Sequence, residues 1–491
     1  MHSMTGLKKP SLFSAIALGV GSIIGSGWLF ASYNAAKFAG PIAILAWIFG
    51  AIIALLIALL LAEVATMFHK EKSLFSRLLA ISHNRDYGFI IAISNWCSMV
   101  VAIPAEAEAT MQYLAEVIPD FHNKIFINNE FSAIGLVFVC FTIIVYGILN
   151  YWGVMLLTKA NNAITIIKLI VPAATAIIFL ITAWHPINFT AFHNTIAPYG
   201  YDKAFTAVVS CGIFYSFYGF SMITIFVREL DNPTRNIPLA LTSSVIICLL
   251  IYILLQISFI GAMDTNAIVT NGWHTLNFTS PLAQLAIVLN INWLSIILYA
   301  DAAVSPSGTA IIYTGSSARM LTGLAHDGQM PKIFKREHPK HNISRLSIII
   351  NLTLCFTLVV FFKNWEKIML VVSVFQLISC VAVPVCFSKL RKTNSTQERT
   401  FIMPFGPVLS FFTYLIISYL LLQAGNKALT LALVCHLIFF TVYCSVYYRN
   451  LKSTFYAFAS SWTMFAYMAI ITLFSFLHEM QIFSETAFIS I

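Results

Sequence analysis

The sequence predicts an all-α polytopic membrane protein with about 12–13 transmembrane helices, and three observations lead to this class. Of its 491 residues, 59% are hydrophobic and only 10% are charged, which excludes a soluble globular domain and a disordered chain. Apolar segments of about 20 residues or more follow one another along the chain, and this is the length that a helix needs to cross a bilayer. Basic residues gather in the short segments between them.

The apolar segments give the expected spans in order. We predict helices at residues 12–38, 40–67, 87–118, 131–150, 158–183, 204–228, 238–263, 290–320, 345–362, 366–388, 405–424, 427–448 and 454–478. The last of these is also compatible with a helix on the membrane surface. No long hydrophilic insertion separates the spans, so function must be built from the helices themselves.

The basic residues set the orientation. With the N-terminus in the cytoplasm, most of the 28 Lys and Arg residues lie on the cytoplasmic side, as the positive-inside rule requires. The net charge of +9 therefore reflects topology and does not indicate a nucleic-acid partner. We expect a multi-pass protein of the cell membrane, embedded in the lipid bilayer, with a cytoplasmic N-terminus.

The first span is interrupted by glycines. The stretch from Gly19 to Gly27 holds four glycines in nine residues, and each glycine weakens a helix. Unwinding in mid-membrane frees amides that lipid cannot satisfy, so a small anionic ligand is the natural partner. The alternative is a close-packing face, because Gly21 and Gly25 also form a small-xxx-small pattern. The predicted ligand amides are those of Ser22, Ile23, Ile24, Gly25, Ser26 and Gly27.

The sixth span carries a second irregularity, at residues 216–220. Two interrupted helices five spans apart, running in opposite directions, are typical of an inverted repeat with a ligand site at its interface. Aromatic rings next to such a break can close over a ligand, although most rings in this chain of 41 phenylalanines must face lipid or core. The candidate residues here are Tyr215, Phe217, Tyr218 and Gly219.

Lys168 lies within the fifth span. It follows Lys159 by nine residues, which places it about 13 Å into a hydrocarbon core of about 30 Å. An ammonium at this depth must find oxygen ligands or lose its proton, and intramembrane ionisable groups are usually functional. We predict proton coupling at Lys168, with a static salt bridge as the alternative.

The candidate partners of Lys168 are intramembrane acids and hydroxyls. Glu106 and Glu108 cannot both face it, because residues two apart point about 200° apart on a helix. Asp301 begins a segment loosened by Pro306 and Gly308. The predicted coupling set is Lys168, Ser305, Ser307, Glu106 and Asp301; serines that only bond to their own backbone are the alternative reading of the two hydroxyls.

Catalytic chemistry is not expected. The sequence contains no nucleophile elbow, no zinc-protease motif and no phosphate-binding loop. Its nine cysteines fall within apolar segments without metal-ligand spacing. We therefore expect no enzyme activity, no metal and no cofactor, and any uphill transport must draw on an ion gradient or on exchange.

Three motifs resemble one known family. Residues 21–27, 226–238 and 317–331 are similar to the first-span motif and to two cytoplasmic loops of the amino acid-polyamine-organocation (APC) superfamily of permeases. Within that superfamily, the chain looks most like bacterial amino acid/proton symporters of the aspartate-permease kind. The resemblance covers residues from about 12 to 390. Its loop positions Glu229 and Arg235 match cytoplasmic signature residues.

The resemblance implies a five-plus-five inverted repeat with discontinuous first and sixth helices. Residues 1–390 would form the transporter core, with spans 1–5 within 12–183 and spans 6–10 within 204–388, and residues 391–491 would add further transmembrane helices. The substrate carboxylate would bind first-span amides, Tyr215 would be an aromatic gate, and Lys168 would lie near Ser305 or Ser307. Ser221 replaces a glutamate found in some members, which disfavours a strongly cationic substrate.

The implied function is proton-coupled amino acid uptake by alternating access, with an amino acid and protons as partners. An amino acid exchanger is the nearest alternative, since it needs the same site without a net proton gradient. A transporter-like nutrient sensor is the remaining alternative, but such sensors need long cytoplasmic tails to signal. The sequence leaves open which side chain the substrate carries.

Overall fold

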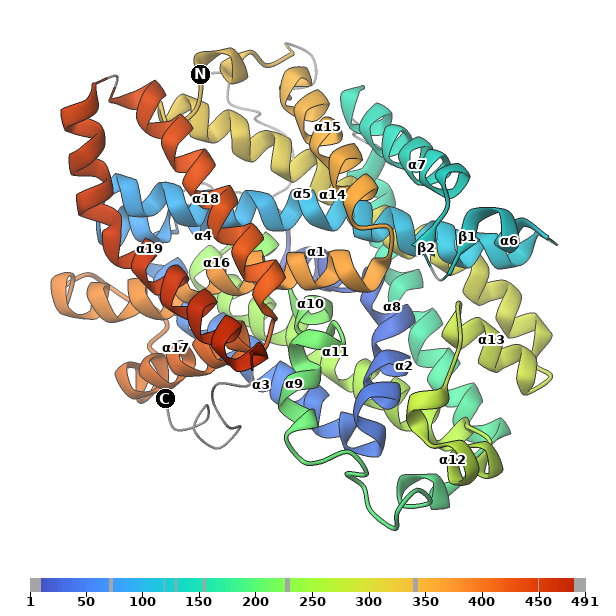
Figure 1. The fold of residues 1–491 in the computed structure, drawn as a ribbon. Helices are drawn as coiled ribbons and strands as arrows, with labels where there is room; N and C mark the ends of the chain where they lie inside the picture. Colours follow the sequence, from blue (N-terminus) through green and yellow to red (C-terminus); the bar gives the residue numbers. More distant parts are fainter. Residues whose placement is uncertain are drawn as a thin grey trace.

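The predicted spans are helices in the computed structural model (Figure 1), which describes residues 10–69, 74–118, 120–128, 130–152, 156–225, 230–338, 343–448 and 450–480. Within these ranges, nine helical segments are long and apolar enough to cross a membrane, and a bent pair of helices at residues 203–224 adds a tenth. Three shorter apolar helices fall on other predicted spans. The expected all-α membrane fold is confirmed.

The first five predicted spans correspond to seven helical segments, because the first span is broken. Helix α1 ends at Ile23 and α2 begins at Gly27, so the break is limited to residues 24–26. Gly19 and Gly21 remain helical, so the break is shorter than the predicted interruption. The segments are α1 (Leu12–Ile23), α2 (Gly27–Ala39), η1 (Gly40–Ile42), α3 (Ala43–Met67), α5 (Arg85–Val117), α7 (Ala133–Tyr151) and α8 (Leu156–Thr182).

The second set of five spans also starts with a broken helix. Here the two halves are bent by 61° relative to each other, and Gly212 and Gly219 both have positive φ at the irregular points. The segments are α9 (Lys203–Ser210), α10 (Ile213–Phe217), η3 (Phe220–Ile225), α11 (Pro233–Ala262), α14 (Asn292–His326), α15 (Arg345–Phe361) and α16 (Trp365–Thr393).

Helix starts follow the sequence closely. Side chains of Ser11, Asn84, Ser132 and Asn364 accept backbone N–H bonds at the N-termini of α1, α5, α7 and α16, which satisfies amides that a helix leaves free. Prolines lie inside α5, α8, α11, α14 and α16. Such prolines are tolerated in membrane helices because neighbouring groups satisfy the freed backbone atoms.

Three C-terminal helices pack on this core: α17 (Gly406–Leu422), α18 (Asn426–Tyr447) and α19 (Leu451–Glu479). Asp86 at the start of α5 accepts hydrogen bonds from Tyr443 at 2.7 Å, Tyr448 at 2.8 Å and Ser460 at 2.9 Å. Ser94 and His436 lie 2.5 Å apart and join α5 to α18 within the core. These polar bonds therefore join the C-terminal helices to α5.

Several short elements connect the spans and were not predicted. They are α4 (Leu74–Ser82), α6 (Phe121–Ile125), the antiparallel pair β1 (Phe126–Ile127) and β2 (Glu130–Phe131), η2 (Pro186–Phe189), α12 (Thr265–Asn271), η5 (Trp273–Thr275), α13 (Pro281–Val288) and η6 (Lys332–Lys335). Their sequences are too short or too polar to give a clear periodic signal.

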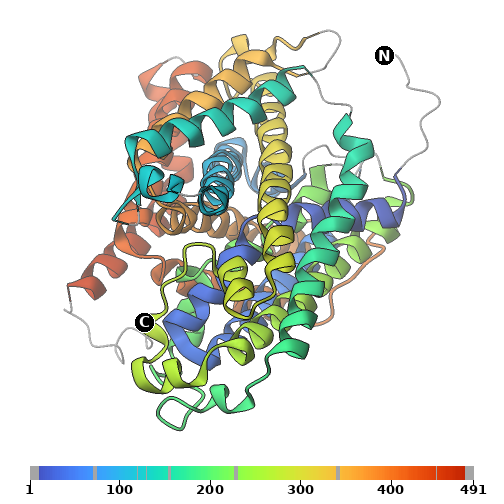
Figure 2. The ribbon, with the colours of Figure 1, turned by 90° about the vertical axis from the view of Figure 1, so that its right-hand side faces the viewer.

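The long helices α5 and α14 form the centre of the molecule. Figure 2 shows α14, in yellow, between the blue α5 and the green α8. Helix α1 packs against α8, α11 and α14, so its broken end lies inside this group. We call the membrane surface where α5 begins and α14 ends the basic side; Gln329, just after α14, donates to the carbonyl of Arg85 there.

Candidate functional site

The first-span break brings polar side chains from several helices against glycines. Gly25 lies inside the break, and a methyl group at that position would overlap Oε1 of Glu106. Gly21 is helical, and a methyl group there would lie 2.6 Å from Oγ1 of Thr165 in α8. These two glycines therefore let neighbouring helices approach closely, as the close-packing alternative predicts. The side-chain groups that approach them are polar.

Glu106 from α5 binds the start of α2. Its Oε2 accepts a hydrogen bond from the Ser26 backbone N–H at 2.7 Å, and its Oε1 accepts one from the Tyr215 hydroxyl at 2.6 Å. All three residues are buried. The N-terminus of a helix carries partial positive charge and favours an acidic group. The amide end of the break is thus occupied by a carboxyl group of the protein itself.

Lys168 from α8 binds the opposite end of the break. Its Nζ donates to the carbonyl of Gly21 at 2.8 Å, to the carbonyl of Ile24 at 2.7 Å and to Oγ1 of Thr309 at 2.7 Å. The last carbonyls of a helix carry partial negative charge, so an ammonium fits them. Lys168 is 1% exposed, and these three oxygens complete the hydrogen bonding of its ammonium group.

The hydroxyl ligand of Lys168 differs from the prediction. Ser307 bonds to Tyr146 at 2.8 Å, and the Ser305 hydroxyl is buried without a hydrogen-bond partner among the described residues. Thr309 takes the expected role because it lies one helical turn after Ser305 and faces the end of α1. Sequence reasoning missed it, although extending the Ser305 face by four residues would have reached it.

The two predicted acids lie in different surroundings. Glu106 contacts the break directly, whereas Asp301 lies two turns before Thr309 on α14. Asp301 is buried, its carboxyl oxygens have no hydrogen-bond partner among the described residues, and it makes no ion pair with Lys168. Glu108 is also buried without a hydrogen-bond partner in the described part of the chain. Only one acid of the α5 pair therefore faces the site, as helix geometry requires.

The predicted amide cradle is narrower in the structure. Ser22 and Ile23 belong to α1, and the amide of Ile24 donates to the carbonyl of Val20 at 2.9 Å, so these three amides are used within the helix. The amide of Gly25 donates to the carbonyl of Ile23 at 3.0 Å. The amides at the start of α2, from Ser26 and Gly27 onward, are those that a ligand carboxylate can reach, and Glu106 holds the first of them.

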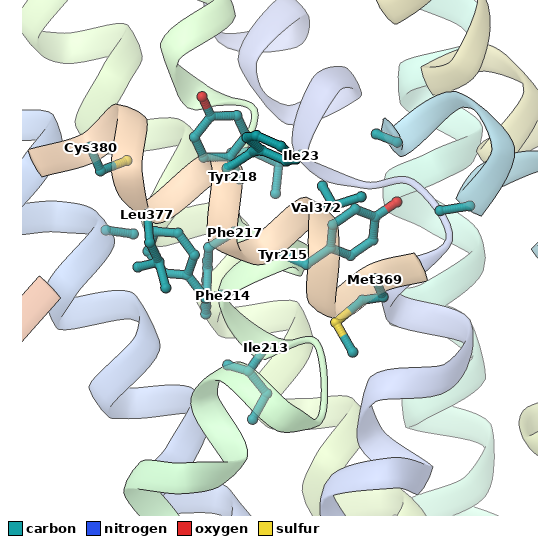
Figure 3. Packing of buried hydrophobic residues seen from close by; sticks show 14 of the residues in the cluster. Ile23, Ile213, Phe214, Tyr215, Phe217, Tyr218, Met369, Val372, Leu377 and Cys380 are labelled. Carbon is teal, nitrogen blue, oxygen red and sulfur yellow. The ribbon is translucent and has the colours of Figure 1, made fainter. Parts of the chain in front are cut away.

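The sixth-span break lies directly against the first. Gly219 has a φ of +125°, and a methyl group there would overlap the carbonyl oxygen of Ser22. In Figure 3, the rings of Tyr215 and Tyr218 point to different sides of the α10 end, with Met369 and Val372 of α16 beside Tyr215. Tyr218 donates to Oδ1 of Asn95 at 3.1 Å.

Phe217 is separate from this group. Its ring packs edge-on against Trp47 and Tyr252, with centroid distances of 5.8 and 5.4 Å. These contacts belong to the interface between α3, α10 and α11. Among the predicted aromatic residues, Tyr215 contacts Glu106 and the break, Tyr218 contacts α5, and Phe217 is part of the hydrophobic core.

Trp365, at the start of α16, was not predicted. Its indole N–H donates to Oγ of Ser26 at 3.0 Å, and its ring stacks on Phe30 at a centroid distance of 4.7 Å. Tyr113 donates to the carbonyl of Leu29 at 3.0 Å. These buried rings cover the break on the side away from the basic side. One tryptophan among nine gives no signal in the sequence unless its helix start is known.

Comparisons with known proteins identify the family of this chain. The family model described as amino acid permease matches residues 11–430, a range that contains both broken spans. The glutamate/serine transporter AimA of Bacillus subtilis (strain 168) is 39% identical over 395 residues, which cover 80% of this chain and 73% of AimA. The aspartate-proton symporter of the same bacterium is 29% identical over 475 residues, covering 96% and 90%.

Two further matches extend the range of relatives. The serine/threonine exchanger SteT of Bacillus subtilis (strain 168) is 24% identical over 446 residues, covering 89% of this chain and 95% of SteT. A crystal structure of a mutant manganese transporter from Eremococcus coleocola matches with a TM-score of 0.57 at 13% identity and covers 94% of each chain. That last likeness concerns the fold alone. From the match over residues 11–430 and the relative at 39% identity, the chain belongs to the amino acid permease family.

Proposed function

We propose that this chain is a secondary transporter that takes up an amino acid together with a proton by alternating access, with its N-terminus in the cytoplasm. The observation that carries the proposal is the pair of ionisable side chains at the two ends of the first-span break. Glu106 binds the amide end and Lys168 binds the carbonyl end. An amino acid brings a carboxylate and an ammonium of its own to the same break.

In the proposed mechanism, the substrate carboxylate competes with Glu106. The amide of Ser26 can serve one carboxylate at a time, so the arriving substrate displaces Oε2 of Glu106 from its 2.7 Å hydrogen bond. A displaced carboxylate in the membrane interior is costly unless it is paired or takes up a proton. Substrate binding and protonation of Glu106 therefore favour each other, which is the requirement for symport.

Lys168 supplies the second coupled group. While charged, it ties the end of α1 to α8 and α14 through Gly21, Ile24 and Thr309. Loss of its proton would remove one donor from that junction and loosen α1 from its neighbours. We propose that this loosening lets the broken helices move relative to α5 and α14 while the substrate is bound.

The covering of the site supports one stage of alternating access. Trp365, Phe30 and Tyr113 fill the side of the break away from the basic side. On the basic side, a hollow lined by Asn95, Ser221 and Arg319 lies beside the sixth-span break. This arrangement fits a conformation closed to one membrane surface and ready to open to the other.

Transport assays in proteoliposomes test the coupling. Purified protein should accumulate labelled glutamate, aspartate or serine when the lumen is alkaline relative to the outside, and a dye in the lumen should report acidification during uptake. Lys168→Met should abolish the gradient-driven component while substrate binding persists. Unaltered proton-driven uptake by Lys168→Met would contradict the coupling role of this residue.

An amino acid exchanger is the second candidate, because the exchanger SteT shares most of its length with this chain. Counterflow separates the two functions. A symporter accumulates label in empty liposomes under a proton gradient, whereas an exchanger requires preloaded amino acid and ignores the gradient. A thermal-shift screen against the twenty amino acids identifies the substrate first, since a ligand that binds only the native state raises its stability by mass action.

A further inference from the structure

A cavity beside the sixth-span break lies outside the central site. It is a small hollow that is partly open to solvent. Its walls come from α4, α5, η3 and α14, and its lining residues are Phe75, Ser76, Asn95, Met99, Ser221, Met222, Ser316, Arg319 and Met320. Because Ser221 follows Gly219 by two residues, the cavity begins where the sixth helix is broken and extends toward the basic side.

Arg319 is the charged residue of this lining. It lies on α14, is exposed to solvent, and makes no ion pair or hydrogen bond with the described residues. A guanidinium presents a planar set of N–H donors that matches a carboxylate. The other lining side chains are neutral, so among the described residues the lining carries one positive charge and no negative one.

The neutral polar groups favour the same kind of ligand. Oδ1 of Asn95 accepts the Tyr218 hydroxyl at 3.1 Å, which leaves the amide NH₂ of Asn95 as the group available to donate. Hydroxyls of Ser221 and Ser316 are also in the lining. A carboxylate in the cavity would meet a cation and several neutral donors, and no acidic residue among the lining residues opposes it.

The distance to the central site shows that the cavity is a separate location. Thr309, which contacts Lys168 at 2.7 Å, precedes Arg319 by ten residues on the same helix. At 1.5 Å per residue, the two lie about 15 Å apart along α14. The two carboxylates of a single aspartate or glutamate are too close together to reach both the Ser26 amide and Arg319.

We propose that this cavity is a second carboxylate-binding subsite, in which Arg319 holds the amino acid between the central site and the basic side. The inference rests on the proposed transport function and adds a second position on the path. A substrate leaving the Ser26 amide is received by Arg319 before it reaches the aqueous phase. Acidic amino acids, with a net negative charge, gain most from this contact.

Side-specific kinetics test the subsite. In membrane vesicles of each orientation, Arg319→Gln should raise the KM for glutamate or aspartate added from the basic side on the order of tenfold, and leave the KM from the other side unchanged. Arg319→Lys keeps the positive charge, so its KM from the basic side should stay close to that of the unsubstituted protein. Lys332→Gln is the matched control, since it removes an exposed positive charge from the basic side outside the cavity lining.

A labelling measurement gives an independent readout that does not depend on removing Arg319. Ser316→Cys, one turn from Arg319, should react faster with an anionic thiosulfonate than with a cationic one, and the substrate should slow the anionic reaction. Equal rates for the two reagents, or no protection by any transported amino acid, would overturn the subsite. A change of KM that is equal from both sides, or equal in Arg319→Gln and Lys332→Gln, would overturn it as well.

These outcomes are distinct from failure of the proposed function. If the unsubstituted protein transports no amino acid in either orientation, the function itself is wrong. If it transports and Arg319→Gln behaves like the Lys332→Gln control, the function stands and the subsite is wrong. In one further outcome, an inorganic anion slows the reaction of Ser316→Cys with the anionic reagent and no amino acid does. That result would assign the cavity to inorganic anions and would also refute the proposal.

Discussion

Replacing Glu106 by glutamine separates the charge of this residue from its hydrogen bonds. The glutamine oxygen can still accept the Ser26 N–H, which lies 2.7 Å from Oε2 in the structure, and its NH₂ group can donate to the Tyr215 hydroxyl, 2.6 Å from Oε1. Shape and volume hardly change. The substitution therefore removes the proton-dependent charge at the amide end of the break and little else.

The expected magnitude follows from the two contacts. A hydrogen bond to a charged group contributes about 1.5–3 kcal/mol, and a neutral one about 1 kcal/mol. Weakening two contacts by about 1 kcal/mol each makes displacement of residue 106 by the substrate easier by about 2 kcal/mol. At alkaline pH, where Glu106 competes as a carboxylate, the Kd of Glu106→Gln for the substrate should be lower than that of the unsubstituted protein by roughly 30-fold.

The assay is equilibrium binding of the identified substrate to detergent-purified protein at several pH values. Binding to the unsubstituted protein should weaken as pH rises, whereas binding to Glu106→Gln should stay nearly constant. In proteoliposomes, uptake by Glu106→Gln should not respond to a proton gradient. Glu108→Gln is the control, because Glu108 is buried two residues away and makes no hydrogen bond with the described residues. Weaker binding by Glu106→Gln at every pH, or an unchanged pH dependence, would refute the competition.

Three further substitutions test other parts of the structure. Lys168→Met removes the ammonium donor from the carbonyls of Gly21 and Ile24, so gradient-driven uptake should be lost while a thermal-shift assay still detects substrate. Gly219→Ala combines a φ of +125° with overlap on the Ser22 carbonyl and should lower stability by about 3 kcal/mol; Gly323→Ala, with no neighbouring atom within 4 Å, should unfold no earlier than the unsubstituted protein. Glu63→Gln weakens the 2.7 Å contact with Arg391 and should lower the free energy of unfolding by about 2 kcal/mol without changing substrate affinity.

Membrane helices were predictable because the bilayer imposes a length and a composition on them. The predicted span 87–118 and helix α5 (Arg85–Val117) differ by two residues or fewer at each end. Intramembrane charges were predictable for the same reason, since an ionisable residue in an apolar run is rare enough to stand out. Lys168 and Glu106 both stand out in this way, and the structure places both at the first-span break. Residues 226–229 of the loop motif, which include Glu229, lie outside the described residues.

Partner identity was not predictable to the same degree, because it depends on how helices distant in sequence meet. Thr309 binds Lys168 in place of Ser305, on the same face of α14, because the end of α1 meets that helix one turn further along, and Ser307 faces Tyr146 instead. Single-sequence patterns do not define where two helices meet. Trp365 reaches Ser26 across 339 residues of sequence. Phe217 faces the core because α10 is only one turn long and turns its aromatic residues in different directions.

The geometry of the break explains why the proposed coupling originates at its amide end. The carbonyls at the end of α1 and the amides at the start of α2 expose opposite partial charges to the same small space. Lys168 is bound there by three oxygens at 2.7–2.8 Å from two helices, whereas Glu106 depends on one amide and one hydroxyl. A substrate carboxylate can replace the Glu106 carboxyl group by competing for one amide. A substrate ammonium would have to break all three hydrogen bonds of Lys168 to take its place. In the proposed mechanism, the carboxylate is therefore the part of the substrate that controls proton binding, and the ammonium uses carbonyls that Lys168 leaves free.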